Sequence, residues 1–219
     1  MNQSHIAFWL KEFEHFTTAI VANGEVPSSE LSIRLLRKMK RIICCDGALQ
    51  KLLSINIIPD VVVGDGDSMD EEELLRYKIP YYADKSEEYN DLQKALKYCI
   101  AKGYDNIVLL GCGGLREDHF IANLSILVMY SEKMRLAMLT EHGVFNVMRG
   151  TSIFRSVPGM QVSVFPSNLH TNLSFSGLKY PVNNRSFNWL WEGSLNEAVG
   201  DAFTVEADEE EPVVVYRTL

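Results

Sequence analysis

The chain has 219 residues and a formal net charge of -8, with 47% hydrophobic and 23% charged residues. This length allows one large domain or two modest ones, and the composition is ordinary for a soluble globular protein. The acidic balance argues against nucleic acid or an anionic membrane as partner, because backbone binding requires clustered Lys and Arg. The acidic charge does not exclude a nucleotide as ligand, because a bound Mg²⁺ can reverse the charge of a small site.

The cysteines and the N-terminus favour a cytoplasmic protein. Four cysteines, two of them adjacent in an apolar run, form neither a CxxC pair nor a zinc pattern. We therefore expect reduced, buried thiols. The N-terminus lacks the pattern of a signal peptide, and no stretch approaches the roughly 20 apolar residues of a membrane helix.

Strand and helix patterns alternate over residues 1–150. The segment 1–16 could be a helix or a strand and carries no functional weight. After it we expect strands at 17–22, 41–45, 61–63, 107–111 and 135–139, and helices at 30–40, 48–53, 92–100 and 118–131. This alternation predicts parallel βαβ units with helices on both faces of the sheet.

The pattern changes after residue 150. Short alternating segments separated by turn residues follow, at 152–155, 161–165, 202–206 and 213–216. We expect residues 151–219 to form a small all-β domain.

Acidic residues follow two predicted strands and precede a predicted helix. Asp46 follows the strand 41–45, Asp65 and Asp67 follow the strand 61–63, and Asp91 begins the helical stripe. Ligands of parallel α/β sheets bind beyond the carboxyl ends of the strands, and Mg²⁺ prefers hard oxygen ligands. A purely structural interpretation stays open, in which Asp65 and Asp67 form a polar turn and Asp91 or Asn90 caps a helix.

A glycine-rich segment follows the strand 107–111. Gly113 and Gly114 could cradle phosphates with backbone N–H groups, and Arg116 offers a planar fork for phosphate oxygens. The segment is neither a Walker A loop nor a dinucleotide fingerprint. Asp118 could instead cap the next helix, and a lone histidine such as His119 is more often structural than functional.

Together these segments resemble the thiamine pyrophosphokinase family. The resemblance covers nearly the whole chain from Thr17 onward and rests on residues 22–25, 45–48, 59–68, 90–96, 113–123, 177–181 and 196–197. It implies a Rossmann-like parallel α/β domain at 1–150, a C-terminal β-sandwich at 151–219, and a homodimer with sites between subunits. The implied reaction moves the terminal diphosphate of ATP onto the hydroxyl of thiamine, giving thiamine diphosphate and AMP.

The resemblance also implies a set of site residues. Mg²⁺ is expected on Asp65, Asp67 and Asp91. The expected catalytic residues are Asp46, Asp65, Asp67, Asp91, Arg116 and Asp118. ATP contacts are expected from Asn23, Gly47, Glu87, Gly113, Gly114, Arg116 and His119, and thiamine contacts from Asp118, Trp191, Ser194, Asn196 and Glu197.

The chain departs from the family pattern in two places. Glu87 and Glu88 stand where the family often has Gln and Asp, and Leu195 precedes Asn196 where the family commonly has Ser. These departures keep an alternative open, a catalytically weak thiamine- or nucleotide-binding sensor. A Mg²⁺-dependent nucleotide phosphohydrolase is a third possibility.

Overall fold

The computed structural model describes residues 2–68 and 71–219, and contacts within the chain divide it into two compact units, Met1–Glu141 and His142–Leu219. The sequence-based boundary lies at residue 150. The contacts assign β7 (Gly143–Met148) to the second unit because it pairs antiparallel with β14 (Val213–Thr218). Among the described residues, no helix is long and apolar enough to cross a membrane.

The first unit is built on six parallel strands. Their order is β6-β5-β1-β2-β3-β4. The strands are β1 (Thr18–Val21), β2 (Arg41–Cys45), β3 (Val61–Gly64), β4 (Tyr81–Ala83), β5 (Asn106–Leu110) and β6 (Arg135–Leu139). The first three strands and β5 are almost wholly buried, which explains their uninterrupted apolar sequences.

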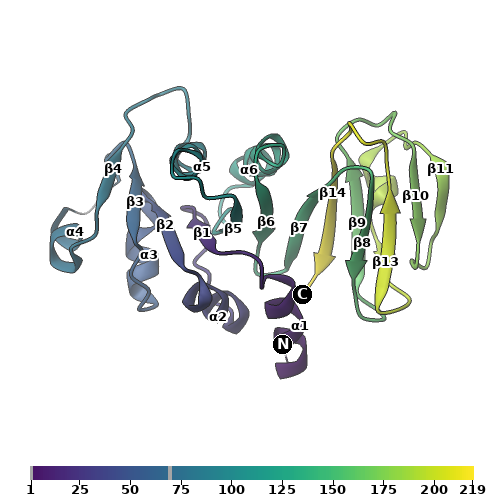
Figure 1. Cartoon of the computed structure of the whole chain (residues 1–219), viewed down its shortest axis with the longest axis horizontal. Coiled ribbons are helices and arrows are strands. Elements are labelled where there is room, and N and C mark those ends of the chain that lie inside the picture. The colour runs from purple at the N-terminus through teal and green to yellow at the C-terminus, as the bar shows by residue number, and fades with distance from the viewer. Residues whose placement is uncertain (1, 69–70) are drawn as a thin grey trace. The chain divides into compact units, whose positions relative to one another are not determined.

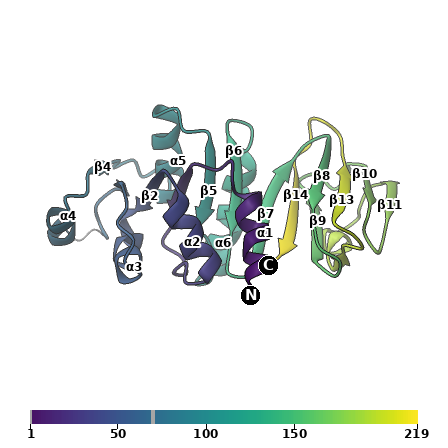
Figure 2. The ribbon, with the colours of Figure 1, turned by 60° about the horizontal axis from the view of Figure 1, so that its bottom comes forward.

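Helices cover both faces of this sheet (Figures 1 and 2). They are α1 (Gln3–Glu12), α2 (Glu30–Lys38), α3 (Leu49–Ser54), α4 (Glu71–Tyr77), α5 (Asp91–Ala101) and α6 (Glu117–Tyr130). Helix α5 contacts β1, β2 and β3 and also α6, so α5 and α6 share a face. Figure 1 shows α2 and α3 on the other face, as right-handed crossovers require when the chain reverses direction across the sheet.

The reversal places a switch point between β1 and β5. The chain runs outward from β1 through β2 and β3 to β4, and then returns to β5 on the other side of β1. The crevice at such a point, beyond the carboxyl ends of the strands, is where ligands bind in open α/β sheets.

The segment left open by the sequence is helical. In α1, Asn2 accepts a hydrogen bond from the His5 N–H as the N-cap, and Ile6 and Trp9 are buried. Helix α1 contacts α2. The apolar residues of this segment therefore belong to the core of the first unit.

The second unit contains two antiparallel sheets. One has the order β12-β9-β14-β7, and the other β11-β10-β13-β8. The remaining strands are β8 (Thr151–Arg155), β9 (Gln161–Pro166), β10 (Leu173–Ser176), β11 (Val182–Arg185), β12 (Asn196–Glu197) and β13 (Ala202–Glu206). Buried residues alternate with more exposed ones along β9 and β13, so each of these strands buries one face.

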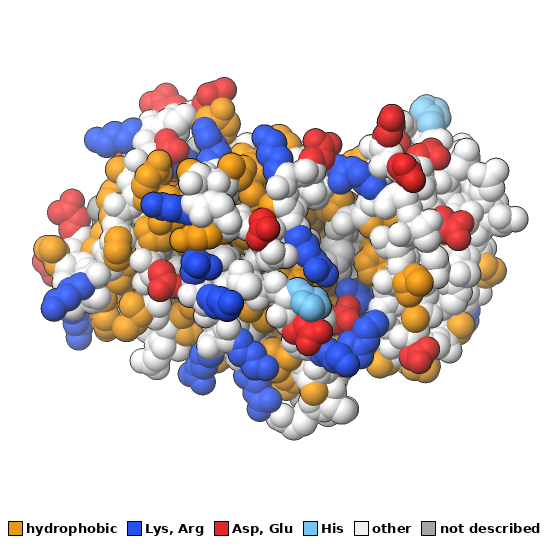
Figure 3. Space-filling model, viewed as in Figure 1, with side chains coloured by type: hydrophobic (Ala, Val, Ile, Leu, Met, Phe, Trp, Pro, Cys, Tyr) orange, Lys and Arg blue, Asp and Glu red, His pale blue; other side chains and the backbone are white. Residues whose placement is uncertain are grey.

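The surface carries both signs of charge. Figure 3 shows acidic and basic side chains interspersed on the face drawn, with hydrophobic side chains between them. Two of the acidic side chains, Asp46 and Asp65, lie directly after β2 and β3.

Candidate active site

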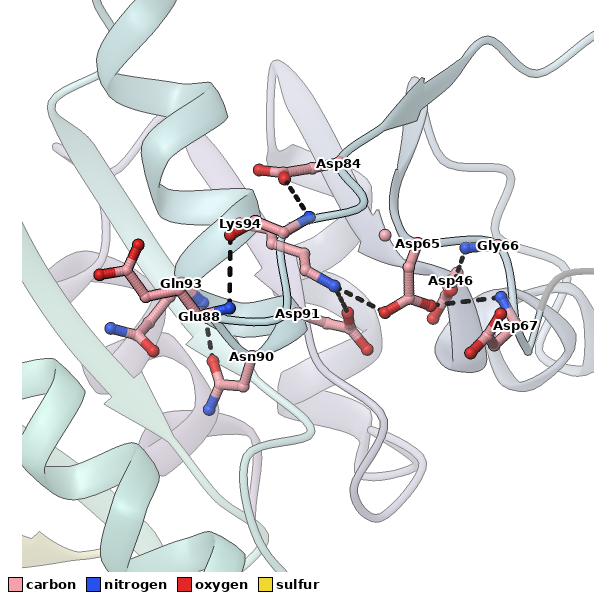
Figure 4. Close-up of polar contacts among 12 residues, drawn as sticks. Asp46, Asp65, Gly66, Asp67, Asp84, Glu88, Asn90, Asp91, Gln93 and Lys94 are labelled. Atoms are coloured by element: carbon pink, nitrogen blue, oxygen red, sulfur yellow. Dashed lines mark hydrogen bonds and ion pairs between the residues drawn. The ribbon is translucent and has the colours of Figure 1, made fainter.

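Three carboxylates and one lysine meet beyond the ends of β2 and β3 (Figure 4). Lys94 Nζ lies 2.7 Å from Asp65 Oδ2 and 3.2 Å from Asp91 Oδ1. The Lys94 side chain is only 2% exposed. In this view Asp46 lies on the side of Asp65 that is opposite Lys94. The sheet therefore brings together three of the predicted acidic residues.

Asp46 is held by backbone donors from both strand ends. Its Oδ1 accepts a hydrogen bond from the Gly47 N–H at 2.6 Å, and its Oδ2 accepts one from the Gly66 N–H at 3.1 Å. The side chain packs over Gly64, where a Cβ atom would lie 2.6 Å from Asp46 Oδ2. Glycine is therefore needed at position 64 because a carboxylate occupies the space of a side chain.

In this cluster the negative charges of Asp46, Asp65 and Asp91 lie close together, and Lys94 supplies the positive charge that offsets them. The hydrogen bond from Lys94 lowers the pKa of Asp65. Burial raises the pKa of Asp91, and the nearby charge of Asp46 adds to the effect. The pKa of Tyr81 is raised by burial and then by Asp46 and Asp65. A cation is therefore favoured at this point.

The simpler interpretations of these residues, as a polar turn and a helix cap, are partly correct. Asn90 is the N-cap of α5, accepting a hydrogen bond from the Gln93 N–H at 2.9 Å, and Asp91 lies in the first turn. The Asp67 N–H donates to Asp65 Oδ1 at 3.2 Å, as in an Asx turn. Turn formation and capping thus orient the acidic side chains.

The predicted metal ligands do not form a closed metal centre. Over residues 2–68 and 71–219, no group of three or more His, Cys, Asp or Glu side chains is placed to hold a metal ion. Lys94 lies between Asp65 and Asp91. The donors are nevertheless of the right kind for Mg²⁺, since all are carboxylate oxygens.

A pocket of about 350 Å³ opens beside the cluster at the switch point. Its walls come from the segments that follow β1 and β5, from the last residue of β2, and from the N-terminal halves of α5 and α6 with the residues before them. The lining residues are Ala22, Asn23, Gly24, Cys45, Asn90, Asp91, Leu92, Gly111, Cys112, Gly113, Leu115, Arg116, His119 and Asn123. Asp91 belongs both to this pocket and to the carboxylate cluster.

Two walls of the pocket are joined by backbone hydrogen bonds. The Gly24 N–H donates to Gly111 O at 2.6 Å, and the Glu25 N–H donates to Gly113 O at 2.7 Å. A Cβ atom on Gly24 would overlap both carbonyl oxygens. The close approach of these two loops therefore requires glycine at position 24.

Arg116 lies at the mouth of the pocket, at the start of α6. Its Nε and Nη2 atoms donate to the two oxygens of Asp118 at 3.1 and 2.6 Å. The hydrogen bond from Arg116 lowers the pKa of Asp118 to about 2. Both side chains are exposed, so an arriving phosphate can compete for the guanidinium at little energetic cost.

Only some of the other residues predicted to contact the nucleotide line the pocket. Asn23, Gly113 and His119 line the pocket. Gly47 lies against the Asn23 side chain, and Gly114 lies against Glu25. Glu87 is exposed in the loop before α5.

The predicted thiamine contacts in the second unit have different surroundings. Asn196 is 6% exposed. Its Oδ1 accepts a hydrogen bond from the Tyr180 N–H at 3.0 Å, and its Nδ2 donates to Tyr180 O at 2.8 Å. The Trp191 ring is 71% exposed, and Ser194 Oγ donates to Trp191 O at 2.7 Å. Glu197 lies 3.6 Å from Lys179 Nζ. Asn196 therefore ties the segment to its neighbour, while Trp191 presents an open aromatic face.

Sequence reasoning missed several residues of the site. It assigned no role to Lys94, although a carboxylate and a lysine three positions apart on a helix are neighbours. It also missed Cys45, Cys112 and Asn123 in the pocket wall, and Lys51 behind it. Only the Asp91–Lys94 spacing was a local signal. Cys45 and Cys112 resemble ordinary core residues, and the contacts of Asn123 and Lys51 depend on how the elements pack.

Two family models match the chain in succession. The "Thiamin pyrophosphokinase, catalytic domain" model matches residues 33–138, and the "Thiamin pyrophosphokinase, substrate-binding domain" model matches residues 143–216. The chain belongs to the thiamin pyrophosphokinase family. The resemblance expected from the sequence is thereby confirmed.

Individual relatives agree with this family. A thiamine pyrophosphokinase from Bacillus subtilis is 32% identical over 144 residues, which are 61% of this chain and 66% of the relative. Thiamin pyrophosphokinase 1 from Caenorhabditis elegans is 26% identical over 201 residues, covering 84% of this chain and 82% of the relative.

Solved structures share the fold. The thiamin pyrophosphokinase from Candida albicans superposes with a TM-score of 0.81 at 20% identity, over 96% of this chain and 91% of that chain. That from Bacillus subtilis gives 0.78 at 23% identity, over 92% and 98%. This likeness confirms an N-terminal mixed α/β domain followed by antiparallel sheet.

Proposed function

We propose that this chain transfers the terminal diphosphate of ATP to the hydroxyl of thiamine, releasing thiamine diphosphate and AMP. The observation that carries the proposal is the position of Asp91, which lines the switch-point pocket and also bonds Lys94 in the carboxylate cluster. A nucleotide in this pocket would have its phosphates beside the carboxylates. Membership of the thiamin pyrophosphokinase family supports the choice of reaction over a binding-only sensor.

The carboxylates are proposed to hold Mg²⁺ on Asp65, Asp67 and Asp91, with Asp46 close by. When bound, the ion would neutralise charge on the transferred diphosphate and on departing AMP. Asp46 is already ordered by the Gly47 and Gly66 N–H groups. The protein thus orders one carboxylate beside the proposed ligand set in advance.

The glycine loop and its arginine are proposed to hold the phosphates. Gly113 and Arg116 line the pocket together with Asn23 and His119. The Arg116 guanidinium, which here donates to Asp118, can donate to phosphate oxygens in the same planar geometry. Asp118 would then be released toward thiamine, the contact that the family resemblance implies.

Attack at the β-phosphorus requires the thiamine hydroxyl in line with the departing AMP oxygen. We propose that a carboxylate takes the hydroxyl proton, with Asp67 and Asp46 as the candidates. Asp67 is exposed, whereas Asp46 is 2% exposed and bonded to two N–H groups. Asp67 is therefore the better candidate, because its side chain can reach an incoming substrate.

In the second unit, Trp191 is proposed to stack on the cationic ring of thiamine. Ser194, Asn196 and Glu197 would position that segment, with Asn196 acting through its bonds to Tyr180. We also propose the Rossmann-like and β-sandwich descriptions of the two domains, a homodimer with sites between subunits, and a cytoplasmic location.

The test is a product analysis by mass spectrometry with Mg-ATP and thiamine, with controls that omit thiamine or add excess EDTA. Equal amounts of AMP and thiamine diphosphate, dependent on Mg²⁺ and on thiamine, are expected. Thiamine bound without AMP formation would favour the sensor alternative. Phosphate or diphosphate released without thiamine would favour a phosphohydrolase.

A further inference from the structure

Behind the pocket, the side chain of Lys51 in α3 closes the turn that follows β1. Lys51 Nζ donates to Asn23 O at 2.8 Å, to Asn23 Oδ1 at 2.6 Å and to Gly24 O at 2.7 Å. An ammonium group has three donors and no acceptor. All three donors of Lys51 are therefore directed at two consecutive residues of the pocket wall.

These bonds fix the orientation of the Asn23 side chain. Because Lys51 can only donate, the Asn23 amide must turn its oxygen toward the lysine. The Nδ2 donor then lies over Gly47, in space that a Cβ atom at that position would occupy. Asn23 also lines the pocket. With its oxygen held by Lys51, the side-chain group that it keeps for a ligand is the N–H₂ donor, which suits an oxygen acceptor such as a phosphate or ribose oxygen.

The hydrogen bonds of Lys51 add to those that already link the turn after β1 to the loop after β5. On one side, Gly24 and Glu25 are bonded to the carbonyls of Gly111 and Gly113. On the other side, Lys51 holds the carbonyls of Asn23 and Gly24. The turn is thus bonded from both sides, which limits its freedom to move away from a bound ligand.

We propose that Lys51 is a positioning residue for the nucleotide, fixing the Asn23–Gly24 turn so that Asn23 Nδ2 faces an oxygen of the bound nucleotide. This inference rests on the proposed function, since it assumes that ATP occupies the pocket. Lys51 itself acts through Asn23 and touches no reacting atom.

The first test replaces Lys51 with Met, which keeps an unbranched apolar stem but removes the donors. The dissociation constant of Mg-ATP is measured by calorimetry, and KM is measured for ATP and for thiamine. We expect ATP to bind up to roughly tenfold more weakly, because one well-placed hydrogen bond to the nucleotide would be lost. The KM for thiamine should change less than about twofold, because Lys51 contacts the turn at the nucleotide pocket.

Two further variants separate positioning from general stability. Lys51→Arg retains several donors and should restore part of the ATP affinity. Lys40→Met removes an exposed lysine from the same unit and should leave ATP binding unchanged. If Lys51→Met weakened both substrates equally, Lys51 would be merely structural and the inference would be wrong.

Asn23→Asp provides a test that does not depend on the stability of a lysine variant. The aspartate keeps an acceptor for Lys51 but replaces the Nδ2 donor with a second oxygen. We expect an unchanged or higher melting temperature together with weaker ATP binding. Unchanged ATP binding in both Asn23→Asp and Lys51→Met would overturn the inference.

The wild-type protein distinguishes this failure from that of the proposed function. If the wild type binds ATP and makes thiamine diphosphate while both variants match it, only the role of Lys51 is wrong. If the wild type neither binds ATP nor makes thiamine diphosphate, the proposed function fails first.

Discussion

Lys94 Nζ lies 2.7 Å from Asp65 Oδ2, and this ion pair is the centre of the candidate active site. The lysine is almost wholly buried, whereas the Asp65 side chain is 39% exposed. A buried ammonium is stable only with anionic partners, and here two carboxylates provide them. Lys94 in turn offsets the repulsion among carboxylates where Mg²⁺ is proposed to bind.

Replacing Lys94 with Met should destabilise the protein by about 1–3 kcal/mol, because Asp65 and Asp91 lose their shared partner. Mg²⁺ should then raise the melting temperature of the variant more than that of the wild type, since it relieves the same repulsion. Urea denaturation with and without MgCl₂ measures both effects. Lys85→Met, at an exposed position, serves as the control. Equal stability and equal Mg²⁺ response of variant and wild type would contradict this role.

Replacing Asp67 with Asn should abolish formation of thiamine diphosphate but change the free energy of unfolding by less than about 0.5 kcal/mol. Asp67 is exposed, and it is its backbone N–H that donates to Asp65. The assay compares initial rates of AMP formation, with circular dichroism as the folding control. Near-normal turnover would remove Asp67 from the site.

Replacing Gly64 with Ala should lower both stability and turnover. The new methyl group would meet the Asp46 carboxylate, with 2.6 Å between Cβ and Oδ2, and overpacking of this kind costs about 1–3 kcal/mol. Gly200→Ala is the matched control, because a Cβ atom there has no described atom within 4 Å. Thermal unfolding and AMP formation should separate the two variants; equal behaviour would show that Asp46 can move without loss.

The thiols should be inert in the native protein. All four cysteines are buried, and burial raises the pKa of both Cys99 and Cys112 to about 12. A raised pKa lowers the thiolate fraction at pH 8, and the thiolate is the reactive form. A colorimetric thiol reagent at pH 8 should therefore react slowly until urea unfolds the chain. Fast reaction of one thiol in native buffer would contradict the buried arrangement.

Replacing Arg116 with Lys should weaken ATP binding about tenfold or more, because lysine lacks the planar fork. The melting temperature should hardly change, since the Arg116–Asp118 pair is exposed. The pKa of Asp118 is lowered to about 2. Its carboxylate therefore stays charged above that pH, and the pairing is lost only as pH falls toward 2. The loss in affinity should thus be constant between pH 5 and 8, and calorimetry at both pH values checks this.

The order of helices and strands was largely predictable because buried parallel strands have continuous apolar sequences. The predicted strand 41–45 coincides with β2, and the predicted helix 92–100 lies within α5. Strand β4 and helix α4 were missed because both are short and largely exposed, so hydrophobic periodicity gives little signal there. Strand β11 was missed for the same reason. Strand β10 buries Leu173 and Phe175 but has only four residues, too few for a clear alternation.

The site was predictable as a set of carboxylates but not as an arrangement. Asp46, Asp65 and Asp91 could be placed at one edge of the sheet because each adjoins a predicted element at its expected end. The pairing of Lys94 with Asp65 depends on how α5 packs against β2 and β3, whereas its pairing with Asp91 is local to the helix. The three bonds of Lys51 depend on the approach of α3 to the turn after β1. Long-range packing of this kind leaves no local pattern in the sequence.

In the proposed reaction, thiamine attacks the β-phosphorus of ATP and receives an intact diphosphate. The most direct measurement uses ATP labelled with ³²P in the α, β or γ position, with separation of the products after a single turnover. We expect the α label in AMP and both the β and γ labels in thiamine diphosphate. A β label recovered in ADP or in free diphosphate, with thiamine unlabelled, would contradict it.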